Sequence, residues 1–205
     1  YINYILNYTY LRPEGITKTL RGTYPYLRYT QTNALFTGID AEAIWHITRQ
    51  LKAIPKASLL RATDVTNDDY LVFIPSNRFD LTLRYEQAAL ASFKNFYIES
   101  KVLYVAEQKR APRVITPRQI QEAGESGVDL FETDDSNFDF MAAPDGYVLW
   151  HMAAGVSIKS KKNQYDFRLA SENLLNEVYR EYTNRFRYYA DEIGRNIMFS
   201  IKCIF

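Results

Sequence analysis

The residues best suited to binding chemistry lie in one basic and aromatic segment near the end of the chain. It contains Arg185, Phe186, Arg187, Tyr188 and Tyr189. Guanidinium groups bind anionic oxygens in a fork-like geometry, and flat rings stack on cations and planar groups. The segment therefore suits an anionic, planar ligand such as a catecholate-like iron chelate or a haem propionate. The alternative interpretation is that these side chains only order the loop that carries them.

Other patterns typical of enzymes and metal sites are weak in this chain of 205 residues. The histidines, His46 and His151, fall on the inward faces of two different expected strands, and nothing further supports a metal or catalytic pair. Gly124–Gly127 lacks the spacing of a serine nucleophile motif. The lone Cys203 excludes an internal disulfide and a multi-cysteine zinc site. We therefore expect no enzymatic activity, no metal site and no cofactor. The net charge of +1 gives no electrostatic reason to expect nucleic acid as a partner.

One acidic stretch offers the hard oxygen ligands that calcium prefers. Its members are Asp129, Glu132, Asp134, Asp135, Asn137 and Asp139. An EF-hand loop has glycine at its sixth position, where this stretch has Phe140. An acidic loop without a metal is therefore favoured over a calcium site.

Apolar residues recur at every second position through much of the chain. The longest unbroken apolar run is Val102–Ala106, whereas a membrane-spanning helix needs about 20 residues. In Asn196–Phe205, the apolar Ile197, Phe199 and Ile201 alternate with mostly polar neighbours. A period of two is typical of β-strands with one apolar face, and such strands keep the mean hydropathy low, here −0.33.

This alternation predicts about eight strands in an all-β, antiparallel fold. They lie in Tyr4–Tyr10, Leu35–Trp45, Ala53–Thr63, Phe79–Tyr85, Phe96–Ala106, Val148–Ile158, Tyr165–Leu169 and Asn196–Phe205. The strand over Ala53–Thr63 is the weakest of these, because Pro55 lacks an amide hydrogen and suits only a strand start or an edge. Helix is expected only as one short turn at Gln119–Gly124.

The connections between these strands alternate between short and long. Short connections are expected at Ile47–Lys52, Gln87–Lys94 and Ser160–Asn163, and long ones at Leu11–Thr30, Asp64–Asn77, Lys109–Gly146 and Glu177–Arg195. Barrels of bacterial outer membranes have short periplasmic turns and longer extracellular loops. The sequence therefore favours a transmembrane antiparallel β-barrel, with a soluble β-protein as the alternative.

The last part of the chain resembles TonB-dependent outer-membrane receptors. The resemblance is carried, in order, by Asn173-Leu174-Leu175-Asn176, Val178–Tyr182, Arg185–Glu192, Gly194-Arg195-Asn196 and the final Phe205. Tyr29–Ala34 and Thr37–Ala41 look similar to a late strand of the same family. The chain departs from the family pattern at Leu175, where Phe is common, and at Ile193, where Pro is common.

The resemblance implies a receptor in the outer membrane of a Gram-negative cell. Its role would be TonB-energised uptake of an iron chelate (siderophore), haem, cobalamin or a similar scarce nutrient. Residues 1–205 would form the C-terminal part of a β-barrel of about 22 strands, as a single partial domain, with the plug domain absent from this chain. The implied partners are the N-terminal plug and remaining barrel strands of the same receptor, TonB through the plug, membrane lipid and, in some subfamilies, a surface lipoprotein.

Within such a barrel, hairpin counting assigns one set of charged side chains to the inner face, where they could contact the plug. The set comprises Asp80, Arg84, Glu99, Lys101, Asp166 and Arg168, with Glu86 and Glu172 beside them. The alternative is that these charges only solvate a wet lumen. Phe205 would act as the C-terminal signal for barrel assembly.

The long loops carry two basic or aromatic sets, the segment 185–189 and a second, basic set. Residues 185–189 would contact the ligand, whereas Lys109, Arg110, Arg113 and Arg118 would hold ligand or lipid phosphates, or simply be solvated. An autonomous eight-stranded outer-membrane barrel with an adhesive or structural role remains an alternative, since about eight strands can close alone.

Overall fold

The computed structural model describes residues 1–90, 93–130, 136–160 and 163–205, and its main element is one open antiparallel sheet. Its long strands pair in chain order: β1 (Ile2–Thr19), β2 (Gly22–Glu42), β4 (Leu51–Asp64), β6 (Arg78–Leu90), β7 (Phe93–Val105), β10 (Tyr147–Ser160), β11 (Asn163–Glu172) and β12 (Asn196–Ile204). The short β3 (Trp45–His46) and β5 (Asp69–Tyr70) both pair with β4. The all-β, antiparallel prediction is confirmed.

The sheet is open rather than closed into a barrel. β1 and β12 are its two edges, and within the described residues neither pairs with the other. The strand number of the complete barrel therefore stays a prediction.

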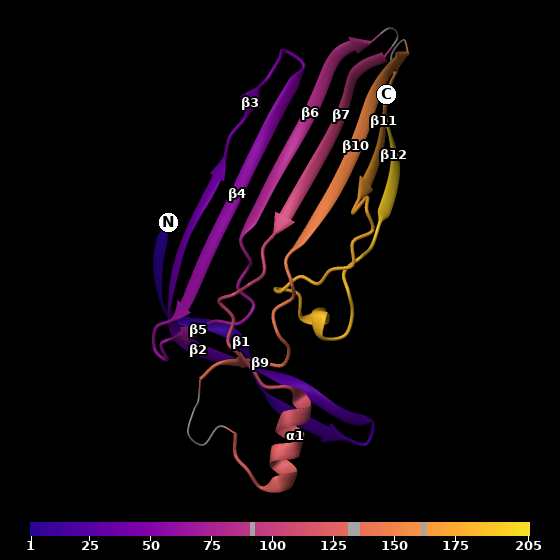
Figure 1. Cartoon of the computed structure of the whole chain (residues 1–205). Coiled ribbons are helices and arrows are strands. Elements are labelled where there is room, and N and C mark those ends of the chain that lie inside the picture. The colour runs from indigo at the N-terminus through magenta and orange to yellow at the C-terminus, as the bar shows by residue number, and fades with distance from the viewer. Residues whose placement is uncertain (91–92, 131–135, 161–162) are drawn as a thin grey trace.

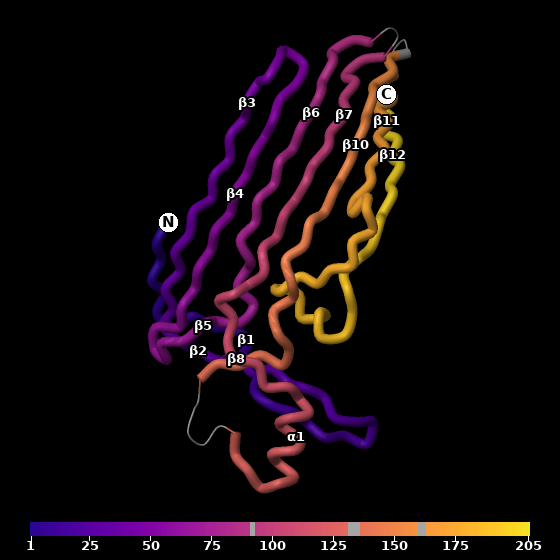
Figure 2. The backbone as a smooth tube through the Cα atoms, viewed as in Figure 1, coloured from indigo at the N-terminus to yellow at the C-terminus, as the bar shows by residue number. Residues whose placement is uncertain are grey.

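The two ends of the sheet differ in how the strands are connected (Figure 1). The connection from β3 to β4, the end of β6 with the start of β7, and the end of β10 with the start of β11 lie together at one end, which we call the turn end. The long connections from β7 to β10 and from β11 to β12 lie toward the opposite, loop end, as the backbone trace shows (Figure 2). The tips of two expected short turns, 91–92 in Gln87–Lys94 and 161–162 in Ser160–Asn163, lie outside the described residues. The expected asymmetry is present.

The long loop expected at Leu11–Thr30 is wrong, because β1 and β2 continue through it as a hairpin. Pairing runs without a loop to Thr19 and Gly22 at the tip. The interrupting Pro13 and Gly15 flank a break in register, and the ring of Tyr26 packs 3.3 Å from the position of a Cβ on Gly15. One irregularity in the ladder thus absorbs the residues that suggested a loop.

Pro55 lies inside β4, not at a strand start or sheet edge as expected. Its carbonyl accepts from Ala43 N at 3.1 Å, and Ala43 lies between the end of β2 and the start of β3. In an antiparallel ladder, the N–H and C=O of one residue point to the same neighbouring strand. The amide hydrogen that Pro55 lacks would therefore point to the gap between β2 and β3. The proline therefore disturbs no regular pairing.

The helical segment is longer than the single turn expected. α1 spans Pro117–Ser126. Thr116 and Gln119 form a reciprocal capping box, with Thr116 N donating to Gln119 Oε1 at 2.9 Å, and Gly127 ends the helix at φ 69°. Alongside it, β8 (Arg113–Val114) and β9 (Phe138–Asp139) form a short parallel pair, and η1 (Arg185–Tyr188) is a 3₁₀ turn.

The buried core lies at the loop end, beneath the long connections. One cluster joins the hairpin to the segment after β5, and contains Tyr10, Ala34, Ala62, Leu71, Val72 and Ile74. A second contains Ile115, Phe138 and Phe140. The core therefore holds the connections onto the strand ends rather than filling the space beside the sheet.

The two faces of the sheet have opposite chemistry. On β6, Phe79, Leu81, Leu83 and Tyr85 share one face and are between 38% and 45% exposed. From Arg78 to Glu86, the alternate residues of that strand are polar or charged. Apolar side chains left uncovered along a whole face indicate an apolar environment outside the chain. In the described part of the chain no helix combines the length and apolarity needed to cross a bilayer.

Candidate functional site

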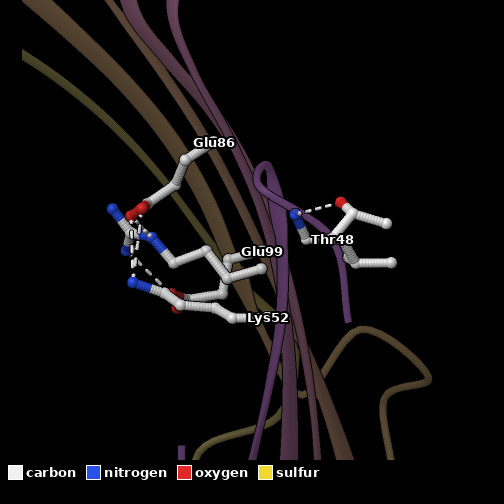
Figure 3. Close-up of polar contacts among 6 residues, drawn as sticks. Thr48, Lys52, Glu86 and Glu99 are labelled. Atoms are coloured by element: carbon white, nitrogen blue, oxygen red, sulfur yellow. Dashed lines mark hydrogen bonds and ion pairs between the residues drawn. The ribbon is translucent and has the colours of Figure 1, made fainter. Parts of the chain in front are cut away.

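The charged face of β4, β6 and β7 carries an ion-pair network toward the turn end. Arg84 is at its centre: Nε donates to Glu86 Oε1 at 2.5 Å and Nη1 to Glu99 Oε2 at 2.9 Å. Lys52 Nζ lies 3.3 Å from Glu86 Oε2, so three adjacent strands are linked by charge (Figure 3). The strand register puts these side chains opposite one another, since Arg84 faces Lys52 on one side and Glu99 on the other.

Arg84 also covers an aromatic ring. Its guanidinium carbon lies 4.2 Å from the centroid of Tyr97, close enough for a cation–π contact. Tyr97 in turn lies over Gly155, its partner on β10, where a Cβ would stand 2.3 Å from the ring. The glycine thus makes room for the ring that supports the arginine.

The other inner-face residues of the sequence prediction share this surface. Lys101 Nζ lies 3.8 Å from Asp80 Oδ2. Asp166 and Arg168 line a hollow of about 650 Å³ with Arg84 and Tyr97. The structure therefore brings all six predicted residues to one face, and their contact with a plug stays a prediction.

Arg187, predicted as a ligand contact, is buried inside the loop end. Its side chain is 1% exposed, as is that of its ion-pair partner Asp139. Arg187 Nη1 also donates to the Ala142 carbonyl at 3.1 Å, and its own carbonyl accepts from Arg180 Nη1 at 2.8 Å. Arg187 thus connects two long connections and is not available to an external ligand in this arrangement.

Aromatic rings enclose this buried pair. The Arg187 guanidinium carbon lies 4.7 Å from the Tyr188 centroid and 4.8 Å from that of Tyr182. Tyr188 donates its hydroxyl to Asp139 Oδ1 at 2.6 Å. Burial first, and then the Asp139 carboxylate, raise the pKa of Tyr188 above its ordinary value, so its phenol stays protonated.

The remaining members of the predicted ligand segment face outward. Phe186 and Tyr189 are 75% and 67% exposed, and Arg185 is exposed as well. Asn184 caps the turn by accepting from Phe186 N at 3.0 Å. The segment thus combines an inner half that orders the loop with an outer half that presents two rings and a guanidinium.

The residues of the receptor-like motif meet at the connection between β11 and β12. Asn173, at φ 48°, brackets Glu177 with two hydrogen bonds of 2.8 Å. Asn176 Oδ1 accepts from Arg195 N at 2.9 Å, and a Cβ on Gly194 would lie 2.7 Å from the same oxygen. The motif therefore closes this connection, which explains why its members are separated in sequence.

A buried polar cluster that sequence reasoning missed lies at the end of β4. Asp64 accepts from Thr32 Oγ1 at 2.5 Å, from Asn67 Nδ2 at 2.8 Å and from Asn137 Nδ2 at 3.2 Å. Burial raises the pKa of Asp64, but the hydrogen bonds lower it more, so the pKa lies below its ordinary value. Tyr10 donates to Asn137 Oδ1 at 2.7 Å and completes the cluster. No local sequence motif predicts this cluster, because its members are far apart along the chain.

The acidic stretch considered for calcium is only partly described. Glu132, Asp134 and Asp135 lie outside the described residues. Asn137 and Asp139 are buried and hold protein partners. Among the residues that the structure places, no group of three or more acidic, histidine or cysteine side chains is arranged to hold a metal ion.

Comparison with solved structures gives the fold of the chain. A copper transporter, OprC, matches with a TM-score of 0.66 and 15% identity over 98% of this chain and 26% of its own. BauA, the ferric preacinetobactin receptor of Acinetobacter baumannii, matches with a TM-score of 0.59 and 16% identity over 95% of this chain and 25% of its own. No family model and no curated protein matches the sequence. The chain therefore has the fold of about a quarter of each of these two proteins.

Proposed function

We propose that the chain is part of the β-barrel of a TonB-dependent receptor that imports a scarce nutrient across an outer membrane. The observation that carries this proposal is the sheet with one exposed apolar face and one charged face. Lipid would cover the apolar face, and the charged face would line the lumen. The fold shared with a copper transporter and a ferric preacinetobactin receptor supports transport over enzymatic activity.

The charged face is the proposed contact surface for a plug domain. Arg84 and Glu99 already satisfy each other, whereas Asp166 and Arg168 line an open hollow. Polar contacts of this kind can break and form again during transport, unlike a packed apolar interface. TonB would act through the plug, and the rest of the barrel would pair with the free edges of β1 and β12.

The proposed substrate is an iron chelate, haem, cobalamin or a similar ligand that meets the outer half of the loop segment. Arg185, Phe186 and Tyr189 are the side chains placed to contact it. Arg187 and Tyr188 would position this surface from beneath. Loss of ligand affinity in Tyr189→Ala, with the stability of the protein unchanged, would support this assignment.

The membrane location is tested by fractionation. We expect the protein that carries this chain to sediment with outer membranes, to require detergent for extraction, and to migrate faster on a gel when unheated than when boiled. Recovery in the soluble fraction without detergent would contradict the proposal.

The reading frame upstream of Tyr1 separates the receptor from its alternative. We expect it to encode further strands and a plug. A stop codon directly upstream would instead favour an autonomous eight-stranded outer-membrane barrel with an adhesive or structural role. The free edges of the sheet support the receptor, because a small barrel needs its first and last strands to pair.

A further inference from the structure

A basic hollow lies at the loop end of the sheet, where β4 continues past the start of β6. It encloses about 610 Å³ and is lined by Arg61, Lys109 and Arg110, with Asn77 and Tyr104. Pairing of β4 with β6 ends at Ser58, so Arg61 stands beyond the last paired row. The hollow is therefore a gap between strand ends rather than part of the charged face.

Its cations are only partly used by the protein. Within the described residues, Arg61 and Lys109 form no ion pair, and both are exposed. Arg110 stacks 4.8 Å from the centroid of Tyr70 and places Nη2 3.4 Å from Thr63 Oγ1, while its buried Nε has no partner. Glu107 is the acid that borders the hollow. The balance of charge favours an anion.

An apolar groove lies beside this hollow on the exposed apolar face. It encloses about 660 Å³, and its floor is formed by the small residues Ala41, Ala43, Pro55 and Ala57. Phe79 and Tyr104 rise at its side, because they follow Ala57 in the same row of the sheet. The charged residues at its border, Glu42, Lys56 and Asp80, alternate to the opposite face, where Lys56 pairs with Glu42 at 2.9 Å.

The hollow and the groove adjoin each other. Tyr104 lines both, and Arg61 stands four residues along β4 from Ala57, so the two face the same side of the sheet. A basic pocket at the rim of the apolar face, followed by an apolar channel away from the loops, matches an amphiphile with an anionic head and acyl chains. Both volumes fall in the range of about 300–1,000 Å³ that small-molecule sites occupy.

We propose that this surface binds an acylated lipid whose head group carries more than one phosphate, with the phosphates at Arg61, Lys109 and Arg110 and one acyl chain in the groove of Ala41, Ala43, Pro55 and Ala57. The proposal rests on the proposed outer-membrane location. Several cations around one hollow match a head group with several phosphates better than a zwitterionic head group with a single one.

The test uses the whole receptor, purified from outer membranes in a mild detergent. Defined lipids are added and bound lipid is measured by native mass spectrometry. The probes are bis-phosphorylated lipid A, its monophosphorylated form, phosphatidylethanolamine and inorganic phosphate. The rim variant Arg61→Ala/Lys109→Ala removes two cations, and Ala57→Leu fills the groove with an apolar side chain that the bilayer tolerates. Arg21→Ala/Arg49→Ala is the matched control, since it removes two exposed cations away from the hollow.

We expect the bis-phosphorylated lipid to bind best, and the rim variant to weaken its binding by about tenfold or more while the control leaves it unchanged. Ala57→Leu should weaken binding of the acylated probe alone. Equal binding to wild type and the rim variant, in a protein that still migrates as a heat-modifiable barrel, would overturn this proposal and leave the proposed function standing. Effective competition by millimolar inorganic phosphate would show an anion site without a lipid and would also overturn it. A protein that is not in the outer membrane at all would refute the proposed function instead.

Discussion

Arg187 and Asp139 form a fully buried ion pair that joins the two longest connections of the chain. Asp139 lies in the connection between β7 and β10, and Arg187 in that between β11 and β12. In the chain, these two connections are separated by the whole hairpin of β10 and β11. The pair makes the loop end one unit, on which the exposed Phe186 and Tyr189 are held.

Removing one partner of this pair should destabilise the loop end strongly. Arg187→Met leaves the Asp139 carboxylate buried without its cation, which typically costs about 3–5 kcal/mol. We expect faster proteolysis in both connections, measured by limited digestion and mass spectrometry. Arg185→Met, at an exposed neighbouring position, is the control and should digest like wild type. Equal digestion of both variants would show that the pair does not hold the connections together.

The Asp64 cluster predicts that the loop end loses stability at low pH. Because the folded pKa of Asp64 lies below its ordinary value, its ionised form stabilises the folded protein above about pH 4, and this contribution is lost as the pH falls further. Asp64→Asn should lower stability at neutral pH by about 1–3 kcal/mol. The thermal midpoints of wild type and variant should converge at low pH. Parallel curves over the whole range would contradict this linkage.

The raised pKa of Tyr188 predicts that the folded protein loses stability at alkaline pH. Its pKa is raised in the folded protein, so its contribution to stability is complete below the ordinary tyrosine value of about 10 and is lost as the pH rises above it. In a spectrophotometric titration at 295 nm, we expect Tyr188 to contribute a component that ionises later in wild type than after unfolding. Tyr188→Phe should remove that late component. Tyr189→Phe, at an exposed ring, is the control and should leave that late component in place.

The assignment of the two faces can be tested on neighbouring residues of β12. Phe199 and Ser200 are both exposed but point to opposite faces. An arginine on the lipid side near the membrane centre costs about 2–4 kcal/mol, whereas one in a lumen costs little. Phe199→Arg should therefore reduce the heat-modifiable fraction, and Ser200→Arg should not. The reverse order would invert the faces.

The contact between Tyr97 and Gly155 predicts that a second substitution, at Tyr97, restores the stability lost on substituting Gly155. In Gly155→Val the new side chain would meet the ring, and we expect a loss of about 1–3 kcal/mol from overpacking. Tyr97→Ser removes the ring and should restore most of the stability of Gly155→Val in the double variant. The heat-modification midpoint measures all three. Additive losses would show that the two residues do not interact.

The strands could be predicted because a period of two is local. Ile197, Phe199 and Ile201 alternate in the sequence whatever they pack against, so β12 was predicted with nearly correct bounds. The β1–β2 hairpin was missed because Pro13 and Gly15 break the local pattern. The continuation of the strands is shown only by cross-strand pairing, which resumes at Gly15 and Tyr26 and runs to Thr19 and Gly22.

The loop end could be predicted only in part. The residue types of 185–189 are visible in the sequence, but the burial of Arg187 depends on Asp139, which is 48 positions away. The same holds for Tyr10 and Asn137, which are 127 positions apart. Such partners are set by which connections fold over which strand ends, and a single sequence carries no local sign of that choice.

The β1–β2 hairpin also has a practical consequence. Its tip at Leu20 and Arg21 is exposed and lies just beyond the pair Thr19–Gly22. The hairpin stands with α1 at the end of the molecule away from the short turns (Figure 1). In a receptor oriented by its long connections, antibodies and bacteriophages would meet this tip on intact cells. A peptide epitope inserted between Leu20 and Arg21 would interrupt no strand pair, and would give a label for living bacteria.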